Sequence, residues 1–347
     1  MASKEELGVP AEERPLCGST AANSSGMSCG NLKYRFLMTG IACLDIVNVC
    51  PRFPEEDEDM RAVGQEWRRG GNASNSSCVM CQLPGARCWL LSTLASDGFE
   101  TEFVQRDLEQ NGVKLDYCVR HDDCRLPTSY VVLSQATGSR TIVHYRKLPN
   151  LDFADFDRIP LEHFSWVHFE ARNMTEVSKM IEKLTRHQQC QPDQRLTISV
   201  EVEKTRRETY PLMGMADVVF ISKEVAQDLG RNDAKSAVVQ LHSLHCRKDA
   251  KLICAWGSCG ADGFSQSEGH VHCDAFPPES LVDTLGAGDT FNAGVLYGLE
   301  SGASLFESIR LGCWLAGRKC GRLGVGNLLD GLSESDTVYS LVSGQQH

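Results

Sequence analysis

The sequence has no long hydrophobic run: in 347 residues, no stretch approaches the roughly eighteen consecutive apolar residues of a membrane-spanning helix. Its N-terminus lacks the basic-then-apolar layout of a signal peptide. The chain carries 35 Lys and Arg against 46 Asp and Glu, which gives a net charge of −11. Nucleic acids and anionic membranes require clustered basic residues, so neither is an expected partner. These absences predict a cytoplasmic globular protein.

The chain has 16 cysteines, but they are scattered and lie mostly within apolar segments. The one close pair, Cys78 and Cys81, is three residues apart in a segment that reads as a helix. A structural zinc site would need a second pair of ligands at matching spacing, and none stands out. The pattern therefore favours buried free thiols in a reducing compartment over a metal site.

The length of the chain suits one large domain or two small ones. Residues 1–31 contain Ser, Ala, Gly, Glu and Pro without an apolar period, which predicts a disordered N-terminal tail. We expect one folded domain from 32 to 332 and a short C-terminal tail from 333 to 347.

Apolar strands alternate with helical patterns through the second half of the chain. The predicted strands are 166–170, 196–203, 217–222 and 251–256, and two helices are predicted at about 288–300 and 304–320. Near the N-terminus, the apolar run at 34–47 predicts one long buried strand, with Asp45 at its end. Strands that are apolar throughout and alternate with helices are typical of a parallel sheet covered on both faces. We therefore expect an α/β fold with a mostly parallel central sheet and helices on both faces.

Two segments do not fit this pattern of alternating strands and helices. Residues 128–146, TSYVVLSQATGSRTIVHYR, predict a hairpin with a Thr-Gly turn, and the acidic segment 46–70 shows no helical period. We expect a small β-sheet lid, built from about 46–70 and 115–147, that stands off the main sheet. Open strand edges in such a lid are commonly covered by pairing.

The segment DTLGAGDTF, at 283–291, runs from a strand-like end through small residues into a predicted helix. Backbone N–H groups at a helix start favour negative charge, and Gly286 and Gly288 would let an anion approach them closely. Asp289 lies in the first turn. It either caps the helix beside a simple glycine turn, or it accepts the proton of an alcohol during phosphoryl transfer while the N–H groups stabilise the phosphoryl oxygens.

A second polar segment, RRGGNASNSS at 68–77, begins another predicted helix. Asn72 and Asn75 are three apart, so their amides share one helix face, and paired amides beside an exposed Gly-Gly backbone suit sugar hydroxyls. The alternative is that Asn72 caps the helix and Asn75 faces solvent. Asp45 is a third candidate, because a carboxylate can accept two hydroxyl hydrogen bonds.

The segments RRGGNASNSSCVMCQLPGA (68–86) and DTLGAGDTFNAGV (283–295) resemble the two signature motifs of the PfkB, or ribokinase-like, carbohydrate kinases, and they stand in the family's order. The resemblance covers about residues 34 to 325. Further segments, among them QEWRRGGNASNS, WVHFEARN and CAWGSCGADG, are similar to the branch that phosphorylates ketohexoses. The resemblance implies a ribokinase-like fold and the ATP-dependent phosphorylation of a ketose, D-fructose to D-fructose 1-phosphate.

The resemblance also implies a role for individual residues. Asp289 corresponds to the catalytic base, and the anion hole corresponds to Gly286, Ala287 and Gly288. The residues implied to hold the sugar are Asp45, Asp57, Gly71, Asn72, Asn75 and Asp289. Arg140 corresponds to a nucleotide-phosphate contact, and the residues implied to line the ATP site are Gly257, Ser258, Cys259, Gly260, Phe276 and Phe291. Without the resemblance, the two phenylalanines would be ordinary core residues.

One departure concerns the N-x-x-E motif that many family members carry for magnesium and phosphate. Ser222 and Val225 stand at its two places, and Glu224 is offset by one, so we expect it to point elsewhere. ATP with Mg²⁺ is implied, with K⁺ as a further candidate, but no metal ligand is assigned; phosphates and water would hold the magnesium. The resemblance also suggests a homodimer that packs lid to lid.

Two other functions stay open. The chain could be another sugar or nucleoside kinase of the family, similar to ribokinase or adenosine kinase, because Asp45, Asn72 and Asn75 do not separate furanose sugars. It could also be a catalytically silent sugar- or nucleotide-binding protein. The intact glycine turn and Asp289 argue against the second possibility, since a silent protein has no need of the base.

Overall fold

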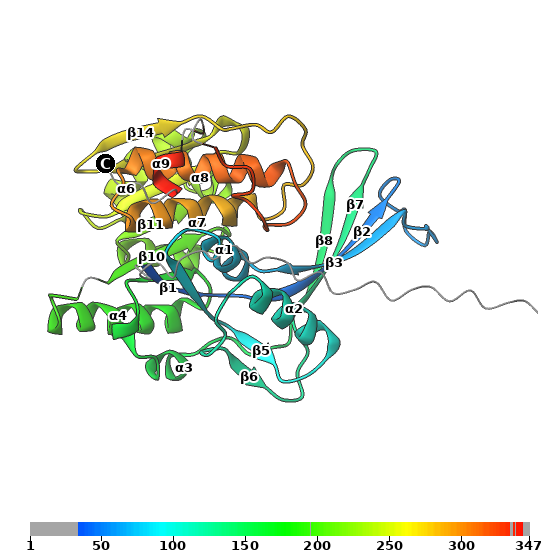
Figure 1. Cartoon of the computed structure of the whole chain (residues 1–347), viewed down its shortest axis with the longest axis horizontal. Coiled ribbons are helices and arrows are strands. Elements are labelled where there is room, and N and C mark those ends of the chain that lie inside the picture. Colours follow the sequence, from blue (N-terminus) through cyan, green and yellow to red (C-terminus); the bar gives the residue numbers. More distant parts are fainter. Residues whose placement is uncertain (1–33, 195, 334–335, 337, 343–347) are drawn as a thin grey trace, which may run out of the picture. The chain divides into compact units, whose positions relative to one another are not determined.

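The computed structural model describes residues 34–194, 196–333, 336 and 338–342 (Figure 1). The strands are β1 (Tyr34–Thr39), β2 (Cys43–Cys50), β3 (Gly64–Gly70), β4 (Ala86–Leu91), β5 (Thr93–Ala95), β6 (Val119–His121), β7 (Thr128–Ser134), β8 (Arg140–Tyr145), β9 (Trp166–Glu170), β10 (Thr197–Val202), β11 (Val218–Ile221), β12 (Lys251–Ala255), β13 (Ala261–Ser265) and β14 (Gly269–Cys273). The helices are α1 (Asn72–Met80), α2 (Phe99–Gln110), α3 (Phe153–Asp157), α4 (Met174–Cys190), α5 (Lys223–Asp228), α6 (Ala234–His245), α7 (Ala287–Glu300), α8 (Leu305–Cys320) and α9 (Tyr339–Val342), with 3-10 turns η1 (Leu161–His163), η2 (Arg207–Gly214) and η3 (Gly257–Cys259). The tail predicted at 1–31 lies outside the described residues, as does part of that predicted at 333–347.

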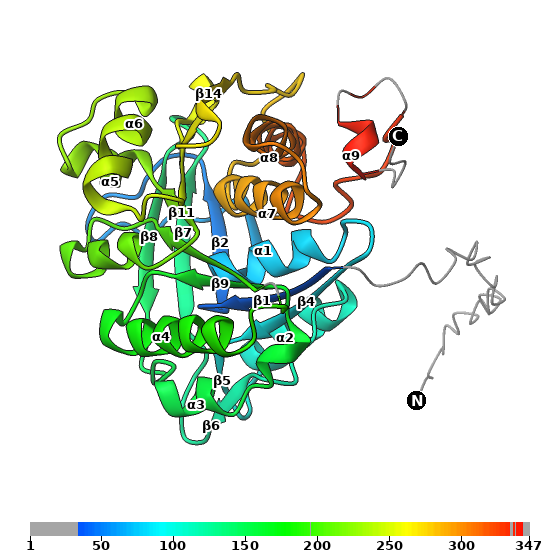
Figure 2. The same cartoon turned by 90° about the vertical axis from the view of Figure 1, so that its left-hand side faces the viewer.

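The central sheet has eight strands in the order β14-β13-β12-β11-β10-β9-β1-β4. The strands from β12 to β4 run parallel, and β13 and β14 continue the sheet antiparallel. Side chains of β1 alternate between two cores: Phe36 and Met38 belong to the core that contains Leu296 of α7, and Leu37 belongs to the core that contains Ile181 of α4. The α/β fold with helices on both faces is therefore confirmed, and Figure 2 shows α4 and α7 on either side of β1.

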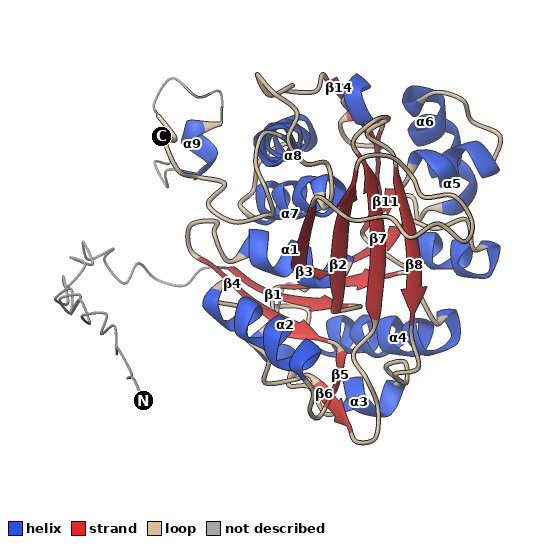
Figure 3. Cartoon of the chain, turned by 90° about the vertical axis from the view of Figure 1, so that its right-hand side faces the viewer, coloured by secondary structure: helices blue, strands red, loops and turns tan. Residues whose placement is uncertain are grey.

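A second sheet of four strands, in the order β3-β2-β7-β8, stands beside the central one (Figure 3). Its inner pair, β2 and β7, is parallel, and both outer pairs are antiparallel. The predicted hairpin at 128–146 is present as β7 and β8. Strand β6 belongs elsewhere, because it pairs with β5 in a separate two-stranded sheet.

The single long strand predicted at 34–47 is wrong. The chain forms β1 in the central sheet, breaks after Gly40, and forms β2 in the second sheet. At the break, the backbone N–H of Ile41 donates to Glu170 Oε2 at 2.6 Å, and a Cβ on Gly40 would lie 2.1 Å from the same oxygen. The hydrophobic run continues across this break, so hydrophobicity alone could not reveal it. Asp45 consequently lies inside β2 and not at a strand end.

Helices α7 and α8 match the predicted pair and lie side by side (Figures 1 and 2). Their contact is a glycine seam, defined by Gly294, Gly298 and Gly312. A Cβ on Gly294 would lie 2.9 Å from the Cα of Gly312, and one on Gly298 would lie 2.8 Å from the Cα of Ser308. The two backbones therefore pack directly against each other, which only glycine permits at such a separation.

The cysteines in the described ranges are all free thiols, including the buried Cys78 and the partly buried Cys81. Among these residues, no group of three or more His, Cys, Asp or Glu side chains is placed to hold a metal ion. No helix in the described part of the chain is long and apolar enough to cross a membrane.

Candidate active site

The candidate residues meet at the carboxyl ends of the parallel strands, where ligands bind in open α/β sheets. Glu170 is the last residue of β9, and Glu201 is the last but one of β10. The first turns of α1 and α7 face this edge, and they carry Asn72 and Asp289.

Asp289 and Asn75 are brought together from sequence positions 214 residues apart. The amide Nδ2 of Asn75 donates to Asp289 Oδ2 at 2.6 Å, and each residue is 8% exposed. The helix-cap interpretation of Asp289 is wrong, because the N-cap of α7 is Gly286 and no side chain caps that helix. Its carboxylate is therefore available to a ligand on the side that Asn75 does not cover.

The cap interpretation of Asn72 is also wrong. Gly71, with φ 96°, is the N-cap of α1, and a Cβ there would lie 2.2 Å from the carbonyl oxygen of Ile41. Asn72 instead donates through Nδ2 to Glu201 Oε2 at 3.2 Å and to Glu203 Oε2 at 3.0 Å. Its amide is thus held at the same edge of the sheet as Asp289.

Sequence reasoning missed the arginine that orients Asn75. Arg69, whose side chain is 6% exposed, donates through Nη1 to Asn75 Oδ1, and its Nε lies 2.5 Å from Asp107 Oδ2 on α2. Because the guanidinium can only donate, it fixes the oxygen of the amide toward itself and the NH₂ toward Asp289. The only sequence signal was the pair of arginines before Gly-Gly.

Sequence reasoning also missed three buried or partly buried glutamates beside Asp289. Glu170 and Glu201 are 5% and 8% exposed, and Glu203 follows β10 directly. Asn292 Nδ2 donates to Glu201 Oε1 at 2.8 Å. Acidic residues inside otherwise apolar strands, as in WVHFE and ISVEVE, were the signal that could have revealed them.

These surroundings control the ionisation of the site. Burial raises the pKa of Asp289 to about 7; the hydrogen bond from Asn75 opposes this shift, and the charges of Glu203 and Glu170 add to it. Burial and the neighbouring charge of Asp289 also raise the pKa of Glu201. A carboxyl group with a pKa near 7 is well matched to accept a proton at neutral pH.

The turn before α7 leaves backbone donors free. Gly286 has φ 81°, in the left-handed region that glycine adopts readily. In the described part of the chain, the N–H groups of Gly288 and Asp289 have no hydrogen-bond partner, whereas that of Ala287 bonds to the Thr284 carbonyl. Two free N–H groups at a helix start can bind an anion, and we refer to residues 286–288 as the anion turn.

Two cavities meet at this turn. The first, of about 450 Å³, is largely apolar, and its lining includes Gly257, Ser258, Gly260, Phe276, Ala287, Gly288, Phe291, Cys313, Ala316 and Gly317. The second, of about 510 Å³, is more polar, and its lining includes Arg140, Glu201, Glu203, Ser222, Lys223, Glu224, Gly288 and Phe291. Gly288 and Phe291 line both, so the apolar cavity opens toward the anion turn. Cys259 is exposed on η3 and lines neither cavity.

The remaining candidates lie on the second sheet or in its loops. Arg140, at the start of β8, reaches the turn, with Nη1 3.3 Å from Thr284 Oγ1. Asp45 is buried in β2, opposite Arg68 of β3, and a Cβ on Gly70 would lie 2.2 Å from its Oδ2. Asp57 is exposed in the β2–β3 loop, and no hydrogen bond or ion pair among the described residues joins it to the other candidates.

Glu224 lines the polar cavity, contrary to the expectation that it would point elsewhere. Ser222 acts as the N-cap of α5, accepting from Val225 N at 3.1 Å, and its hydroxyl donates to the Glu203 carbonyl at 2.7 Å. The hydroxyl of Ser222 therefore forms hydrogen bonds to the backbone both as acceptor and as donor. Three glutamates line the polar cavity, namely Glu201, Glu203 and Glu224.

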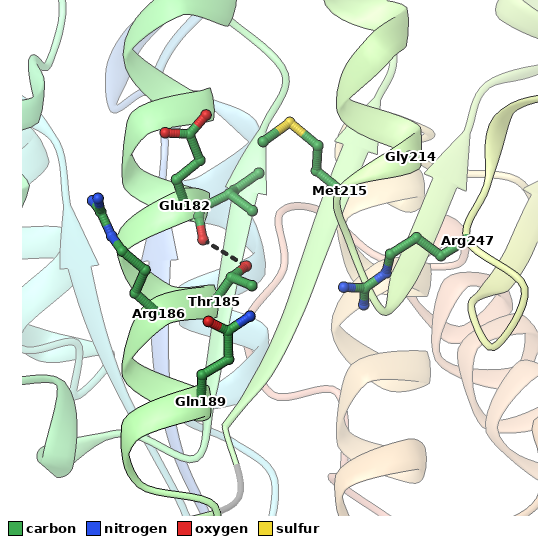
Figure 4. A pocket seen from close by; sticks show the side chains of 8 residues that line it. Glu182, Thr185, Arg186, Gln189, Gly214, Met215 and Arg247 are labelled. Carbon is green, nitrogen blue, oxygen red and sulfur yellow. Dashed lines mark hydrogen bonds between the residues drawn. The ribbon is translucent and has the colours of Figure 1, made fainter.

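Another hollow, of about 410 Å³, lies between α4 and the end of η2 (Figure 4). Glu182, Arg186 and Gln189 face it from α4, and Arg247 faces it from the opposite side. Arg247 is paired with Asp217, and none of the candidate residues lines this hollow.

The comparisons with known proteins agree with one another. The model of the pfkB family carbohydrate kinases matches residues 36–330. Ketohexokinase of Mus musculus is 43% identical over 292 residues, which cover 84% of this chain and 97% of that protein. Ribokinase of Bacillus subtilis is 23% identical, with coverage of 78% and 87%. The solved structure of Arabidopsis thaliana ribokinase with ribose and ATP superimposes with a TM-score of 0.69 at 19% identity, covering 84% of this chain and 94% of that one. The predicted ribokinase-like fold is confirmed.

Proposed function

Since the chain belongs to the pfkB family of carbohydrate kinases and is a kinase, we propose that it phosphorylates D-fructose with ATP to give D-fructose 1-phosphate. The observation that carries this proposal is the buried Asp289, fixed by Asn75 beside two free N–H groups where the apolar and polar cavities meet. The 43% identity to a ketohexokinase supports the choice of sugar.

In the proposed reaction, Asp289 accepts the proton of the fructose C1 hydroxyl. The hydroxyl oxygen forms a bond to the γ-phosphorus of ATP, and the bond from that phosphorus to the β,γ-bridging oxygen breaks, so ADP leaves. The N–H groups of Gly288 and Asp289 stabilise the charge on the phosphoryl oxygens, together with the turn at Gly286 and Ala287. Arg140 contacts the phosphates from the second sheet.

ATP and fructose bind in different parts of the site. The adenine lies in the apolar cavity, flanked by Phe276 and Phe291, along the loop of Gly257, Ser258, Cys259 and Gly260. The sugar hydroxyls bind Asp45, Gly71, Asn72 and Asn75, with Asp57 as a further contact. The buried Asp45 and the fixed amides support this placement, because each can bond to a hydroxyl.

Magnesium fits the polar cavity. Mg²⁺ takes oxygen ligands and keeps several waters, so one or two carboxylates beside the phosphates suffice. Glu203 and Glu224 line that cavity and are the side chains that would hold the hydrated ion. The ion neutralises charge on the phosphates when bound. Stimulation by K⁺ stays a prediction, to be checked by replacing K⁺ with tetramethylammonium in the assay.

Exposed apolar side chains on the second sheet, which is the predicted lid, support a homodimer that packs through this sheet. Trp67, Tyr130 and Val143 lie in one row across the sheet and are 42%, 47% and 66% exposed. A second copy that packs on this row would remove the apolar surface from water. Light scattering tests this interface. We expect the wild type to be a dimer and Val143→Glu to be a monomer, and a monomeric wild type would refute the proposed homodimer. The free thiols support a cytoplasmic location.

A substrate panel tests the proposed reaction. Release of ADP is measured with fructose, ribose, adenosine and fructose 6-phosphate, and phosphorus NMR locates the product phosphate. We expect fructose to give the highest kcat/KM and a product phosphorylated at C1. A preference for ribose or adenosine would transfer the chain to another branch of the family, and sugar binding without ADP release would make it a silent binder.

Asp289→Asn tests the base. General acid–base catalysis contributes about 10²- to 10⁴-fold, so kcat is expected to fall by that factor. The melting temperature should be kept or raised, because the variant removes a carboxyl group that burial makes costly to ionise. Near-normal turnover by the variant would remove Asp289 from the mechanism.

A further inference from the structure

Lys319, on α8, is the one lysine among the described residues that is buried completely, with 0% exposure. Its ammonium Nζ donates to Asp283 Oδ2 at 2.7 Å and to the Asp283 carbonyl at 2.8 Å, and lies 3.5 Å from the Arg322 carbonyl. A buried ammonium is costly unless it is paired and hydrogen-bonded, as it is here. These oxygens surround the ammonium as they would a bound cation.

Asp283 is the hub of this arrangement. Its Oδ1 accepts from the N–H of Leu285 at 2.9 Å, and its Oδ2 accepts from that of Gly324 at 3.2 Å. The preceding residue, Val282, donates its N–H to the Cys320 carbonyl at 2.8 Å. The ammonium therefore fastens the segment 282–285 to the end of α8, and that segment leads directly into Gly286 and the free N–H groups.

The second sheet contacts the same segment at two adjacent residues. Arg68, on β3, places Nη1 3.2 Å from Asp283 Oδ2, and Arg140, on β8, places Nη1 3.3 Å from Thr284 Oγ1. Lys319 and Arg68 thus bind the same carboxylate oxygen, one from the helical layer and one from the lid. A displacement of Asp283 would move the anion turn and loosen a contact to the lid.

We propose that Lys319 is a positioning residue whose ammonium serves as the resident monovalent cation of the anion turn, holding Asp283 so that the N–H groups of Gly288 and Asp289 meet the transferred phosphoryl group. The role in turnover rests on the proposed kinase reaction, whereas the role in holding the turn does not. Removal of the ammonium should leave a cavity lined by oxygens, which a small external cation can enter.

The test compares Lys319→Ala with Lys235→Ala, which removes an exposed ammonium from α6. Melting temperature is measured in chloride salts of K⁺, NH₄⁺ and tetramethylammonium at equal ionic strength, without substrate. We expect K⁺ and NH₄⁺ to raise the melting temperature of Lys319→Ala by several degrees relative to tetramethylammonium. Wild type and Lys235→Ala should show no such difference. Because no substrate is present, this result is independent of which sugar the enzyme uses.

Turnover supplies the second readout. A misplaced anion turn is expected to lower kcat about 10- to 100-fold in Lys319→Ala, with a smaller change in the KM for ATP, and NH₄⁺ should restore part of the loss. Lys319→Gln fills the cavity with a neutral side chain, so its kcat should fall without rescue by any cation. This variant carries the test if Lys319→Ala does not fold.

Three outcomes would overturn the proposal. One is a Lys319→Ala variant with unchanged kcat in tetramethylammonium. Another is a loss of kcat and melting temperature that responds equally to all three cations. The third is a Lys319→Gln variant that folds and turns over at the wild-type rate. Rescue confined to K⁺ and NH₄⁺ supports it, even if fructose proves to be the wrong sugar and another substrate is used for turnover.

Discussion

The amide nitrogen of Asn75 lies 2.6 Å from Oδ2 of Asp289, and the oxygen of the same amide accepts from Arg69. This amide therefore connects the proposed base to a buried cation. Because Arg69 fixes the orientation of the amide, Asn75 presents its donor to Asp289 through contacts within the protein. A donor held in this way can stabilise the carboxylate without reorganisation, which is the condition for strong electrostatic stabilisation.

The pH dependence should show the influence of this donor. Asp289 accepts a proton only when it is ionised, so kcat/KM should rise with pH and level off above a midpoint near its pKa of about 7. In Asn75→Ala, loss of the hydrogen bond that lowers this pKa should move the midpoint to higher pH. In Glu203→Gln, loss of a nearby negative charge should move it to lower pH.

These shifts are measured from pH–rate profiles, with Glu208→Gln as a control that removes an exposed carboxylate from η2. Only the midpoint is compared, because Asn75 is also proposed to bind sugar. Shifts in the same direction for Asn75→Ala and Glu203→Gln would contradict the assignment of the rising limb to Asp289.

Arg69 should matter through geometry more than through charge. Arg69→Lys keeps the positive charge, but a single ammonium cannot reproduce the planar fork that reaches both Asn75 and Asp107. We expect a free energy of unfolding lower by about 1–3 kcal/mol and a clear fall in kcat/KM for the sugar. Asp107→Asn, which keeps a side-chain acceptor, should have a smaller effect. Urea unfolding and steady-state kinetics measure both, and equal activity of Arg69→Lys and wild type would refute the positioning role.

The two glycines of the anion turn should respond differently to alanine. At Gly286, φ is 81° and a Cβ would lie 3.2 Å from Val325 Cγ1, so Gly286→Ala is expected to destabilise the fold by about 1–3 kcal/mol. At Gly288, an added Cβ would have no atom within 4 Å apart from its chain neighbours and the backbone of its own helix. Gly288→Ala should therefore keep its melting temperature, but raise the KM for ATP because the methyl group enters the space of the phosphates. Unchanged ATP kinetics in Gly288→Ala would place the phosphates elsewhere.

Phe276 distinguishes a nucleotide contact from ordinary packing. Stacking of a base on an aromatic ring is worth about 1–3 kcal/mol, so Phe276→Ala should weaken ATP binding about 5- to 150-fold. Phe306→Ala, which removes an exposed ring from α8, is the matched control. Calorimetric binding of ATP is the measurement. If Phe276→Ala lowers only the melting temperature, the ring belongs to the core and does not flank adenine.

The sequence was sufficient to predict the layers of the fold and the pairing of two distant motifs. Apolar strands and glycine-bounded helices carry local signals, and the segments around Asn75 and Asp289 contain the residue types that their chemistry needs. The position of the break after Gly40 was missed, because a hydrophobic run looks the same whether it continues in one sheet or crosses into another. The cause of the break, Glu170, is 130 residues away.

The partners of the candidate residues were also beyond the sequence. The hydrogen bond from Arg69 to Asn75 depends on how β3 and α1 are oriented relative to each other. The pairing of Lys319 with Asp283 depends on how α8 packs against the segment 282–285 that precedes α7. Buried charged residues are informative only once their burial is known. The capping interpretations of Asn72 and Asp289 were wrong for a related reason: glycines take both N-cap positions, where backbone conformation outweighs a side-chain bond.

The glycine seam between α7 and α8 has a consequence for how nucleotide choice can evolve in this chain. Cys313, Ala316 and Gly317 of α8 line the apolar cavity, and α8 packs closely on α7 at the seam, where a Cβ on Gly294 would lie 2.9 Å from the Cα of Gly312. The width of the cavity therefore depends on the distance between α7 and α8, which the glycines of the seam set. A methyl group at Gly294 would shift the whole wall at once, so variants selected for a different purine should include changes in the seam as well as in the lining.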